Sequence, residues 1–371
     1  MRRFILLSAI LASACAASTP PETPFKITTK AVFDEPWAMV FLPDGRALIT
    51  EKGGKIKLWA DNGAVSDVTG GPQPVNAGQG GLGDIILHPD FRNNGYVYLS
   101  WVEGTRKLSG AAVGRAKLIL PGGMEGASGA TPRLEGLQVI WRQEPKVSGH
   151  GHFGHRLAFG PDGMLYISSG ERQKFDPAQD PDTNLGKIVR LSDGGMIPSD
   201  NPSYDHGRIR AQVWSMGHRN PLGIAFDGAG RLWEIEMGPR GGDELNLISR
   251  GANYGWPRVS NGTHYDGRDI PDHAASDGYQ APKVWWNPAI SPGSLMIYSD
   301  TRFPEWKGDA FVGALGDQAL IRIDLDGDKA VKAEQWPMER RIREVEQGPD
   351  GAIWMLEDGD KGRLLRLDPV R

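Results

Sequence analysis

The sequence predicts an all-β protein, a six-bladed β-propeller with four antiparallel strands in each blade. Gly (50) and Pro (27) are abundant among the 371 residues, which suits many short strands joined by turns. A turn with Pro-Asp or Asp-Gly, followed by a short strand-like run, recurs six times along the chain. The sequence shows no long stretch with the periodicity of an amphipathic helix.

Each copy of this repeat predicts one hairpin of a blade. The copies are LPDGRALITEK from Leu42, HPDFRNNGYVYLSW from His88, GPDGMLYISSGE from Gly160, FDGAGRLWEIEMG from Phe226, the diverged FPEWKGDAFVGAL from Phe303, and GPDGAIWMLED from Gly348. Their spacing of about 45 to 80 residues agrees with a four-stranded blade plus loop insertions. A ring of such sheets leaves only short, protected edges. A pair of β-sandwiches is the alternative architecture.

Further strand-like runs lie between the copies, at KIKLW from Lys55, DIILH from Asp84, AKLIL from Ala116 and LQVIW from Leu137. In the second copy, Tyr96, Tyr98 and Ser100 alternate with Val97, Leu99 and Trp101. This alternation predicts a strand that is covered differently on its two faces. We expect a single six-bladed propeller domain over residues 25–371, without an internal linker.

Residues 1–24 have the pattern of an export signal followed by a disordered tether. Arg2 and Arg3 precede an apolar run from Phe4 to Ala14, which is too short to span a bilayer as a helix. The single cysteine, Cys15, ends this run in LASAC, a sequence similar to a bacterial lipobox. We therefore expect export to the periplasm with a lipid anchor at Cys15. Ordinary cleavage nearby is the alternative.

The composition excludes several classes of protein and site. An apolar fraction of 39% is too low for a multi-span membrane protein, and a net charge of -4 without a long basic run argues against a nucleic-acid partner. A lone cysteine excludes an intrachain disulfide and a cysteine metal cluster, and no CxxCH motif is present to attach haem. We expect a monomer.

Three histidines crowd the segment GHGHFGHRLAFGPDG, from Gly149 to Gly163. Because alternate residues of a strand share one face, His150, His152 and His155 suggest a zinc site, although their spacing matches no zinc signature. An imidazole also removes a hydroxyl proton near neutral pH, which makes a general base the better functional interpretation. A purely structural histidine is the alternative for each.

Two arginine motifs suit an anionic ligand. The sequence GHRNP predicts a loop that projects Arg219 and Asn220, or a surface loop whose arginine pairs with a nearby Asp. Arg341 and Arg343 are two apart on a predicted strand, so they face the same side and suit a ligand with several carboxylates. The alternative is a solvated basic edge balanced by Glu339, Glu344 and Glu346.

The stretch from Glu236 to Trp256 combines glycines with Asp243 and Glu244. Backbone carbonyls and a carboxylate are calcium-type ligands, but the acidic spacing is not that of an EF-hand. An ordinary acidic turn is the alternative.

Taken together, these motifs resemble the soluble pyrroloquinoline-quinone (PQQ) dependent aldose sugar dehydrogenases, also called the glucose/sorbosone dehydrogenase family. The resemblance covers about Pro36 to Leu367 and rests on GQGGLGDIILHPDF, HFGHRLAFGPDG, GKIVRL, GHRNPLG, GPRGGDELN and NYGWP, in this order. The family implies a six-bladed propeller that oxidises an aldose at its anomeric carbon to a lactone. A hydride passes to PQQ, and an external quinone or cytochrome then takes the electrons.

The resemblance also implies roles for individual residues. His152 falls on the catalytic base, and Glu171 on an acidic residue that orients it. Contacts to PQQ are implied for Gln79, Arg219, Asn220, Tyr265, Ala314, Leu315, Gly316, Arg341 and Arg343. Calcium is implied at the main-chain oxygens of Gly238 and Pro239 or, in a second family pattern, at Glu244 and Tyr254.

The sequence departs from the family at Gly316, where many members carry a Lys that contacts the quinone oxygens, and at His155, where Gly is common. Arg172, Lys174 or an arginine elsewhere would be candidates to replace the missing cation. Two other functions stay open: a non-enzymatic cell-envelope propeller that has lost its cofactor, and a calcium-dependent lactonase-type hydrolase.

Overall fold

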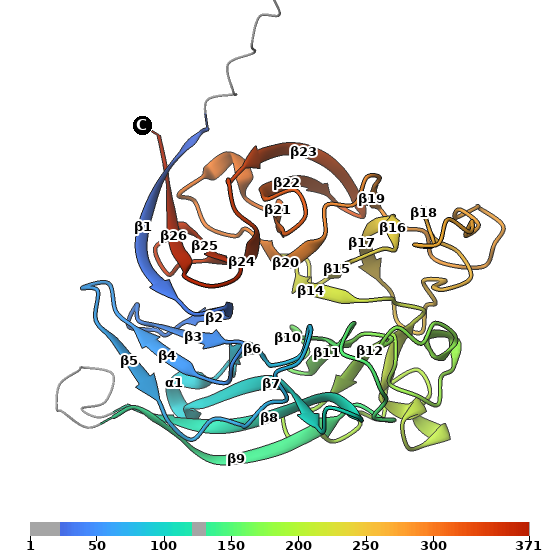
Figure 1. Ribbon diagram of the computed structural model, residues 1–371, viewed down its shortest axis with the longest axis horizontal. Coiled ribbons are helices and arrows are strands. Elements are labelled where there is room, and N and C mark those ends of the chain that lie inside the picture. The colour runs from blue at the N-terminus through green and yellow to red at the C-terminus, as the bar shows by residue number, and fades with distance from the viewer. Residues whose placement is uncertain (1–22, 121–130, 371) are drawn as a thin grey trace, which may run out of the picture.

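The computed structural model describes residues 23–120 and 131–370, and the predicted export signal with Cys15 lies outside these residues. Six four-stranded antiparallel sheets are arranged as blades around a central axis, as the sequence predicts (Figure 1). Among the described residues, no helix is long and apolar enough to cross a membrane.

The first three blades follow the chain without interruption. Blade 1 holds β2 (Pro36–Phe41), β3 (Ala47–Glu51), β4 (Ile56–Trp59) and β5 (Val65–Val68). Blade 2 holds β6 (Leu82–Leu87), β7 (Tyr96–Gly104), β8 (Ser109–Ile119) and β9 (Arg133–Arg142), with the short helix α1 (Phe91–Asn94) between β6 and β7. Blade 3 holds β10 (Gly154–Phe159), β11 (Leu165–Ser169), β12 (Lys187–Leu191) and β13 (Val213–Met216).

The last three blades carry the longer insertion and the ring closure. Blade 4 holds β14 (Pro221–Phe226), β15 (Leu232–Glu236), β17 (Asp243–Ile248) and β19 (Val284–Trp286), and β16 (Arg240–Gly241) pairs separately with β18 (Gly262–Thr263). Blade 5 holds β20 (Pro292–Ile297), β21 (Ala310–Ala314), β22 (Ala319–Asp326) and β23 (Lys329–Pro337). Blade 6 holds β24 (Ile342–Gln347), β25 (Ile353–Glu357), β26 (Gly362–Pro369) and β1 (Phe25–Phe33).

The two ends of the chain close the ring. Strand β1 pairs antiparallel with β26, from Phe25 opposite Pro369 to Phe33 opposite Gly362. Figure 1 shows the blue β1 beside the red β26 at the outer side of the last blade. Blade 6 is therefore built from both ends of the sequence.

The six repeat copies occupy the same place in every blade, the turn between the first and second strand together with the second strand. Gly163 and Gly351 occupy these turns with φ of 74° and 78°, a region that glycine enters without steric cost. The prediction of one hairpin per copy is thus confirmed, and the runs KIKLW, DIILH, AKLIL and LQVIW also lie in strands or overlap them.

The blades pack face to face, so each sheet is covered by a different neighbour on each side. In β7, Val97 and Leu99 belong to an apolar cluster with Leu48 of blade 1. On the other face, Tyr98 belongs to a cluster with Leu157 and other residues of blade 3. This arrangement confirms the alternation predicted for the strand and explains why both of its faces are buried.

One arginine ties all six blades together at the axis. Arg156 of β10 donates from Nε to the carbonyl of Leu222 in β14 at 2.8 Å and from Nη2 to the carbonyl of Gly293 in β20 at 2.5 Å. Its guanidinium carbon lies 4.1 Å from the ring centroid of Trp37 in β2.

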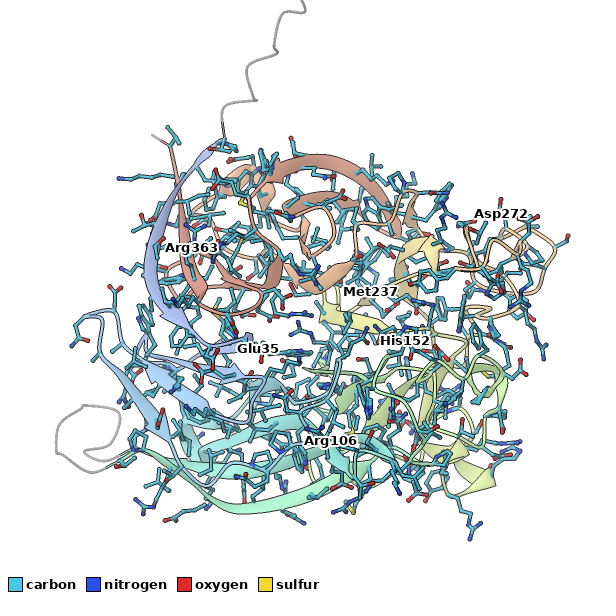
Figure 2. The ribbon with its side chains drawn as sticks, viewed as in Figure 1. Glu35, Arg106, His152, Met237, Asp272 and Arg363 are labelled. Atoms are coloured by element: carbon cyan, nitrogen blue, oxygen red, sulfur yellow. The ribbon has the colours of Figure 1, made fainter. Side chains whose placement is uncertain are left out.

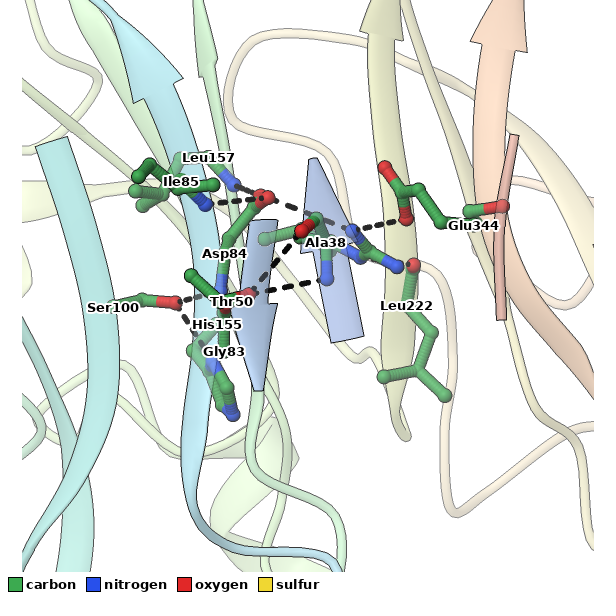
Figure 3. A network of polar contacts seen from close by, with 12 residues as sticks. Ala38, Thr50, Gly83, Asp84, Ile85, Ser100, His155, Leu157, Leu222 and Glu344 are labelled. Atoms are coloured by element: carbon green, nitrogen blue, oxygen red, sulfur yellow. Dashed lines mark hydrogen bonds and ion pairs between the residues drawn. The ribbon is translucent and has the colours of Figure 1, made fainter. Parts of the chain in front are cut away.

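Two carboxylates are the remaining partners of the Arg156 guanidinium. Nη1 of Arg156 lies 2.6 Å from Oε2 of Glu344 in β24 and 3.5 Å from Oδ1 of Asp84 in β6. Figure 3 shows this network together with Thr50, Ser100 and His155, which join neighbouring strands. Because Arg156 is buried, its charge is balanced by these acids rather than by water.

We expect Arg156→Met to unfold at a lower temperature, because it leaves Asp84 and Glu344 buried without a counter-charge, a loss of about 3–5 kcal/mol. Burial raises the pKa of both acids, and Arg156 opposes that rise. When the pKa of an acid is higher in the folded than in the unfolded state, the folded protein loses stability as the pH rises through that pKa. The difference in stability between Arg156→Met and the wild type should therefore grow with pH. Thermal unfolding at pH 5 and pH 8 measures this. Equal losses in Arg142→Met, whose half-exposed side chain pairs with Glu103, would contradict it.

Candidate active site

The first strands of the blades surround a pocket of about 280 Å³ on one face of the ring. Its lining comes mostly from segments that enter the first strand of a blade or leave the second. Figure 2 labels two lining residues, Glu35 and Met237, near the centre of the ring. Five of the predicted cofactor contacts belong to this lining: Gln79, Asn220, Leu315, Arg341 and Arg343.

His152 lies between two lining residues of this pocket, Gln79 and Phe153. Its backbone N–H donates to Oε1 of Gln79 at 2.7 Å, and its own φ is 51°. Nδ1 of the imidazole lies 2.5 Å from Oε1 of Glu171. An ionised carboxylate only accepts, so Nδ1 carries the proton and donates it. Nε2 of the neutral ring therefore keeps a free lone pair.

The environment holds this pair in the form that a general base needs. Burial lowers the pKa of His152 below its ordinary 6.5, and the charge of Arg219 lowers it further. The hydrogen bond to Glu171 raises this pKa but does not outweigh the burial. Burial raises the pKa of Glu171, but the hydrogen bonds from His152 and from the Phe175 N–H outweigh it, so the pKa is lowered overall. At pH 7 the pair is a neutral imidazole beside a carboxylate.

The second oxygen of Glu171 fixes the loop that follows it. Oε2 accepts from the backbone N–H of Lys174 at 2.5 Å and of Phe175 at 2.7 Å. Arg172, Gln173 and Phe175 all have positive φ, a conformation that side chains other than glycine rarely adopt. One carboxylate thus holds both the imidazole and this strained turn.

Arg341 and Arg343 face the same side, as predicted. Nε of each donates to a different oxygen of Asp358, at 2.8 and 2.9 Å. Asp358 lines the pocket as well, and the described structure shows no ion pair from either arginine to the glutamates considered from the sequence. Two guanidinium groups share one carboxylate, so this wall of the pocket keeps a net positive charge.

The other histidines of the segment point elsewhere, so the three do not form the zinc site considered above. His155 is buried, stacks on Trp37 with ring centroids 5.0 Å apart, and places Nδ1 2.8 Å from Oγ of Ser100. Burial lowers the pKa of His155 to about 3, so its ring is neutral. His150 is exposed.

Arg219 and Asn220 lie in a loop, as predicted, but they are buried rather than exposed to solvent, and Asn220 lines the pocket. They are only 5% and 1% exposed. Nη1 of Arg219 donates to the carbonyls of Met237 and Gly238, at 2.8 and 2.5 Å. Oε2 of Glu236 accepts from the backbone N–H groups of Arg219 and Asn220. The turn after β15 supplies acceptors that replace water, which is why a guanidinium is stable there.

An acidic ladder on blade 4 was missed from the sequence. Glu236 of β15 lies opposite Glu244 of β17, and Glu234 lies opposite Asn246. All four side chains are buried, and Oε1 of Glu234 and Oδ1 of Asn246 have no hydrogen-bond partner among the described residues. Burial and the charge of Glu236 raise the pKa of Glu234 and Glu244. Like charges opposite one another destabilise a sheet, so this oxygen-rich ladder suits a hard cation.

The signal for this ladder was present. Glu234 and Glu236 alternate along one strand, and Glu244 and Asn246 along the next, so each pair shares a face. Among the described residues, the one group of three potential metal ligands within 4.8 Å of one another is His218, Glu234 and Glu236.

The residues implied in calcium binding lie close to this ladder. Gly238, Glu244 and Tyr254 line one cavity of about 10 Å³, which has room for about one water molecule or ion. The hydroxyl of Tyr254 donates to the carbonyl of Leu247 and accepts from the N–H of Ser249, so its main-chain oxygen is the atom left for a cation. Pro239 is buried beside Gly238.

The other implied cofactor contacts lie outside the pocket lining. Tyr265 is 73% exposed, with its hydroxyl 3.4 Å from Nη2 of Arg219. Ala314 and Gly316 flank the lining residue Leu315. A Cβ at Gly316 would lie 2.9 Å from the carbonyl oxygen of Ile290, so a side chain there requires the backbone to shift.

Neither residue considered as a replacement for the missing Lys reaches the pocket. The guanidinium of Arg172 is buried and donates to the carbonyls of Ser109, Gly149 and Gly151, while Nζ of Lys174 lies 3.3 Å from Oγ of Ser148. The cations in the described lining are Lys52, Arg341 and Arg343.

Comparison with known proteins gives a consistent result. The family described as glucose/sorbosone dehydrogenase matches residues 33–366. Aldose sugar dehydrogenase YliI of Escherichia coli (strain K12) is 39% identical over 344 residues, which cover 91% of this chain and 90% of that protein. The apo-form crystal structure of the soluble aldose sugar dehydrogenase of Escherichia coli has a TM-score of 0.87 at 37% identity, covering 93% and 100% of the two chains. The PQQ-bound aldose sugar dehydrogenase of Streptomyces coelicolor has a TM-score of 0.76 at 26% identity, covering 94% and 99%.

We expect the His152 imidazole to titrate below pH 6.5, and Glu171→Gln to lower its pKa further. The carboxylate stabilises the imidazolium, so its neutral replacement removes an interaction that raises the pKa. NMR titration of ring-labelled histidine, assigned with His152→Gln, measures both values. A higher pKa in Glu171→Gln would contradict the assigned pair.

Proposed function

The chain belongs to the glucose/sorbosone dehydrogenase family, and from this premise we propose that it oxidises aldoses at the anomeric carbon to lactones, with PQQ as cofactor. Sugar dehydrogenase activity follows from the family, since relatives matching most of the chain are named for it. The observation that carries the finer proposal is the hydrogen bond from His152 to Glu171 beside a pocket lined by two arginines.

The pocket lining fits the chemistry of PQQ. This cofactor carries three carboxylates on a flat ring system, and the lining offers Arg341, Arg343 and Lys52. The two arginines share the single carboxylate of Asp358, so they have charge and donors left for an anion. When bound, PQQ would supply an ortho-quinone that accepts a hydride and its two electrons.

We assign the removal of the substrate's hydroxyl proton to His152. Nε2 takes the proton of the C1 hydroxyl as the C1–H bond breaks, and the C–O bond becomes the carbonyl of the lactone. Glu171 holds Nδ1–H, orients the ring and stabilises the imidazolium that forms. Glu236 fixes Arg219 and Asn220 through their backbone N–H groups beside the same pocket.

Calcium belongs to the proposal because of the acidic ladder. Glu236 and Glu244 line a cavity with room for about one ion. The neighbouring Glu234 and Asn246 each have one side-chain oxygen without a partner among the described residues. The carbonyl of Gly238 lines the same cavity but already accepts from Arg219. We therefore assign the cation of this cavity to the Glu244 and Tyr254 pattern. A second cation beside PQQ, at the main-chain oxygens of Gly238 and Pro239, would have to share the Gly238 carbonyl with Arg219.

The hydrolase alternative is less well supported. The structure does contain a denser carboxylate and amide cluster than the sequence suggested, but its cavity of about 10 Å³ admits no substrate. For the remaining parts we propose export through residues 1–24, a lipid anchor at Cys15, and an external quinone or cytochrome as electron acceptor.

The purified chain from residue 25 onward, supplied with PQQ and calcium, should reduce a redox dye with glucose and other aldoses. His152→Ala should lower kcat by about 10²–10⁴-fold while PQQ still binds, because the base is lost and the cationic wall is kept. Dye reduction and quenching of tryptophan fluorescence by PQQ measure the two effects. Wild-type activity in His152→Ala would remove His152 as the base, and absence of PQQ binding to the wild type would favour the non-enzymatic propeller.

Calcium should stabilise the chain even without PQQ. At one hundred times its Kd, a ligand of the folded state adds about 2.7 kcal/mol. In Glu234→Gln/Glu244→Gln this gain should disappear, while stability without calcium should rise because buried like charges are removed. Thermal unfolding with CaCl₂ or EDTA measures both, with the exposed Glu135→Gln as control. An unchanged response to calcium in the double variant would place the ion elsewhere.

A further inference from the structure

Arg172 is a buried cation without an ion pair. Its side chain is 0% exposed, its guanidinium donates to three carbonyl oxygens, and the described residues give it no carboxylate partner. Burial lowers the pKa of Arg172 to about 10, so the group is still charged at pH 7. Burying a charge among neutral partners is unfavourable, and a neutral side chain would serve better if Arg172 did no more than stabilise the fold.

The three carbonyls belong to the segment before the base and to a strand of blade 2. Nε of Arg172 donates to Gly151 at 2.9 Å, Nη2 to Gly149 at 2.6 Å, and Nη1 to Ser109, the first residue of β8, at 2.6 Å. Glycine loses more conformational freedom on folding than any other residue, so this segment needs external support. A guanidinium provides it, because its planar fork holds five donors in fixed directions. Arg172 thereby ties the residues before His152 to a rigid sheet.

Arg172 also contacts the base and the residue that follows it. Its backbone N–H donates to the carbonyl of His152 at 3.2 Å, and Arg172 and His152 both have positive φ, 62° and 51°. Such strained backbone persists where the surroundings enforce it. The guanidinium carbon lies 3.7 Å from the ring centroid of Phe153, which lines the pocket. Arg172 therefore lies directly behind the pocket wall and holds the chain on both sides of His152.

The charge of Arg172 acts on the imidazole. Among the described residues, the charged groups that act on His152 are the acid Glu171 and the cations Arg219 and Arg172, while the contacting Gln79 is neutral. Burial has the largest effect and lowers the pKa of His152; Glu171 raises this pKa, and both cations lower it. A general base must be neutral before the substrate binds. The two arginines thus offset the carboxylate, which by itself favours the imidazolium.

We propose that Arg172 is a positioning residue for the base, which fixes the glycine segment before His152 and, by its charge, favours the neutral imidazole. This inference rests on the proposed function and adds a residue to it. Arg172 does not belong to the pocket lining, so it acts through His152 and not on the substrate or the cofactor. Its replacement should therefore change kcat and its pH dependence, and leave substrate binding almost unchanged.

Arg172→Met removes both the fork and the charge. The pKa of His152 should rise, because a cation that opposes the imidazolium is lost. NMR titration of ring-labelled histidine, without added PQQ, measures this change. In dye reduction with glucose, the acid limb of the kcat profile should move to higher pH. The plateau of kcat should fall about 10–100-fold, because the base is less well placed, with little change in KM.

Arg172→Lys separates the two parts of the proposal. Lysine keeps the charge but lacks the planar fork, so the pKa of His152 should stay at its wild-type value while kcat still falls roughly tenfold. Arg142→Met is the matched control, since it removes a half-exposed guanidinium at the end of β9, and it should change neither quantity. If Arg172→Met does not fold, Arg172→Lys decides.

Two results would overturn the inference and leave Arg172 as a residue that only stabilises the fold. One is an unchanged or lower pKa of His152 in folded Arg172→Met, and the other is wild-type kcat in Arg172→Lys. If the wild type oxidises no aldose, the proposed function fails instead. The NMR titration then still decides whether Arg172 acts on His152, because it requires neither substrate nor cofactor.

Discussion

The guanidinium of Arg156 is the contact on which the rest of the structure depends. It belongs to one blade and touches the first strand of each of the other five, through carbonyls of Leu222 and Gly293, the ring of Trp37 and the carboxylates of Asp84 and Glu344. Trp37 and Leu222 also line the central pocket, and on the other side Arg156 lines a second cavity of about 110 Å³. The same group therefore fixes the spacing of the blades and contacts two residues of the pocket lining, Trp37 and Leu222.

Around the pocket, carboxylates hold the functional side chains and loops in place. Glu171 uses one oxygen for His152 and the other for the turn at Lys174 and Phe175. Glu236 holds the backbone of Arg219 and Asn220, and Asp358 aligns Arg341 and Arg343. Each acid accepts several donors in a buried or half-buried place, which makes the geometry stiff before any ligand arrives.

Much of this was accessible from the sequence, for identifiable reasons. Turn glycines and alternating strands repeat, so the number of blades and the hairpin in each copy followed from local pattern alone. The histidine segment and the pair Arg341 and Arg343 could be singled out because each motif is local, and only the family resemblance then distinguished His152 from its neighbours. Arg219 was misjudged because its burial depends on carbonyls of Met237 and Gly238, about 20 residues away. The acidic ladder was missed because it is assembled from two strands whose register only the fold decides.

The pairing of β1 with β26 has a consequence for how the molecule forms. Phe25 is packed between Trp306 and Trp336, so the first strand of the domain is buried against the last third of the chain. Contacts of such large sequence separation are slow to form, because the whole intervening chain must be brought to one place. The sixth blade stays incomplete until Pro369 is available to face Phe25. A nascent chain therefore cannot close the ring until β26 has been synthesised.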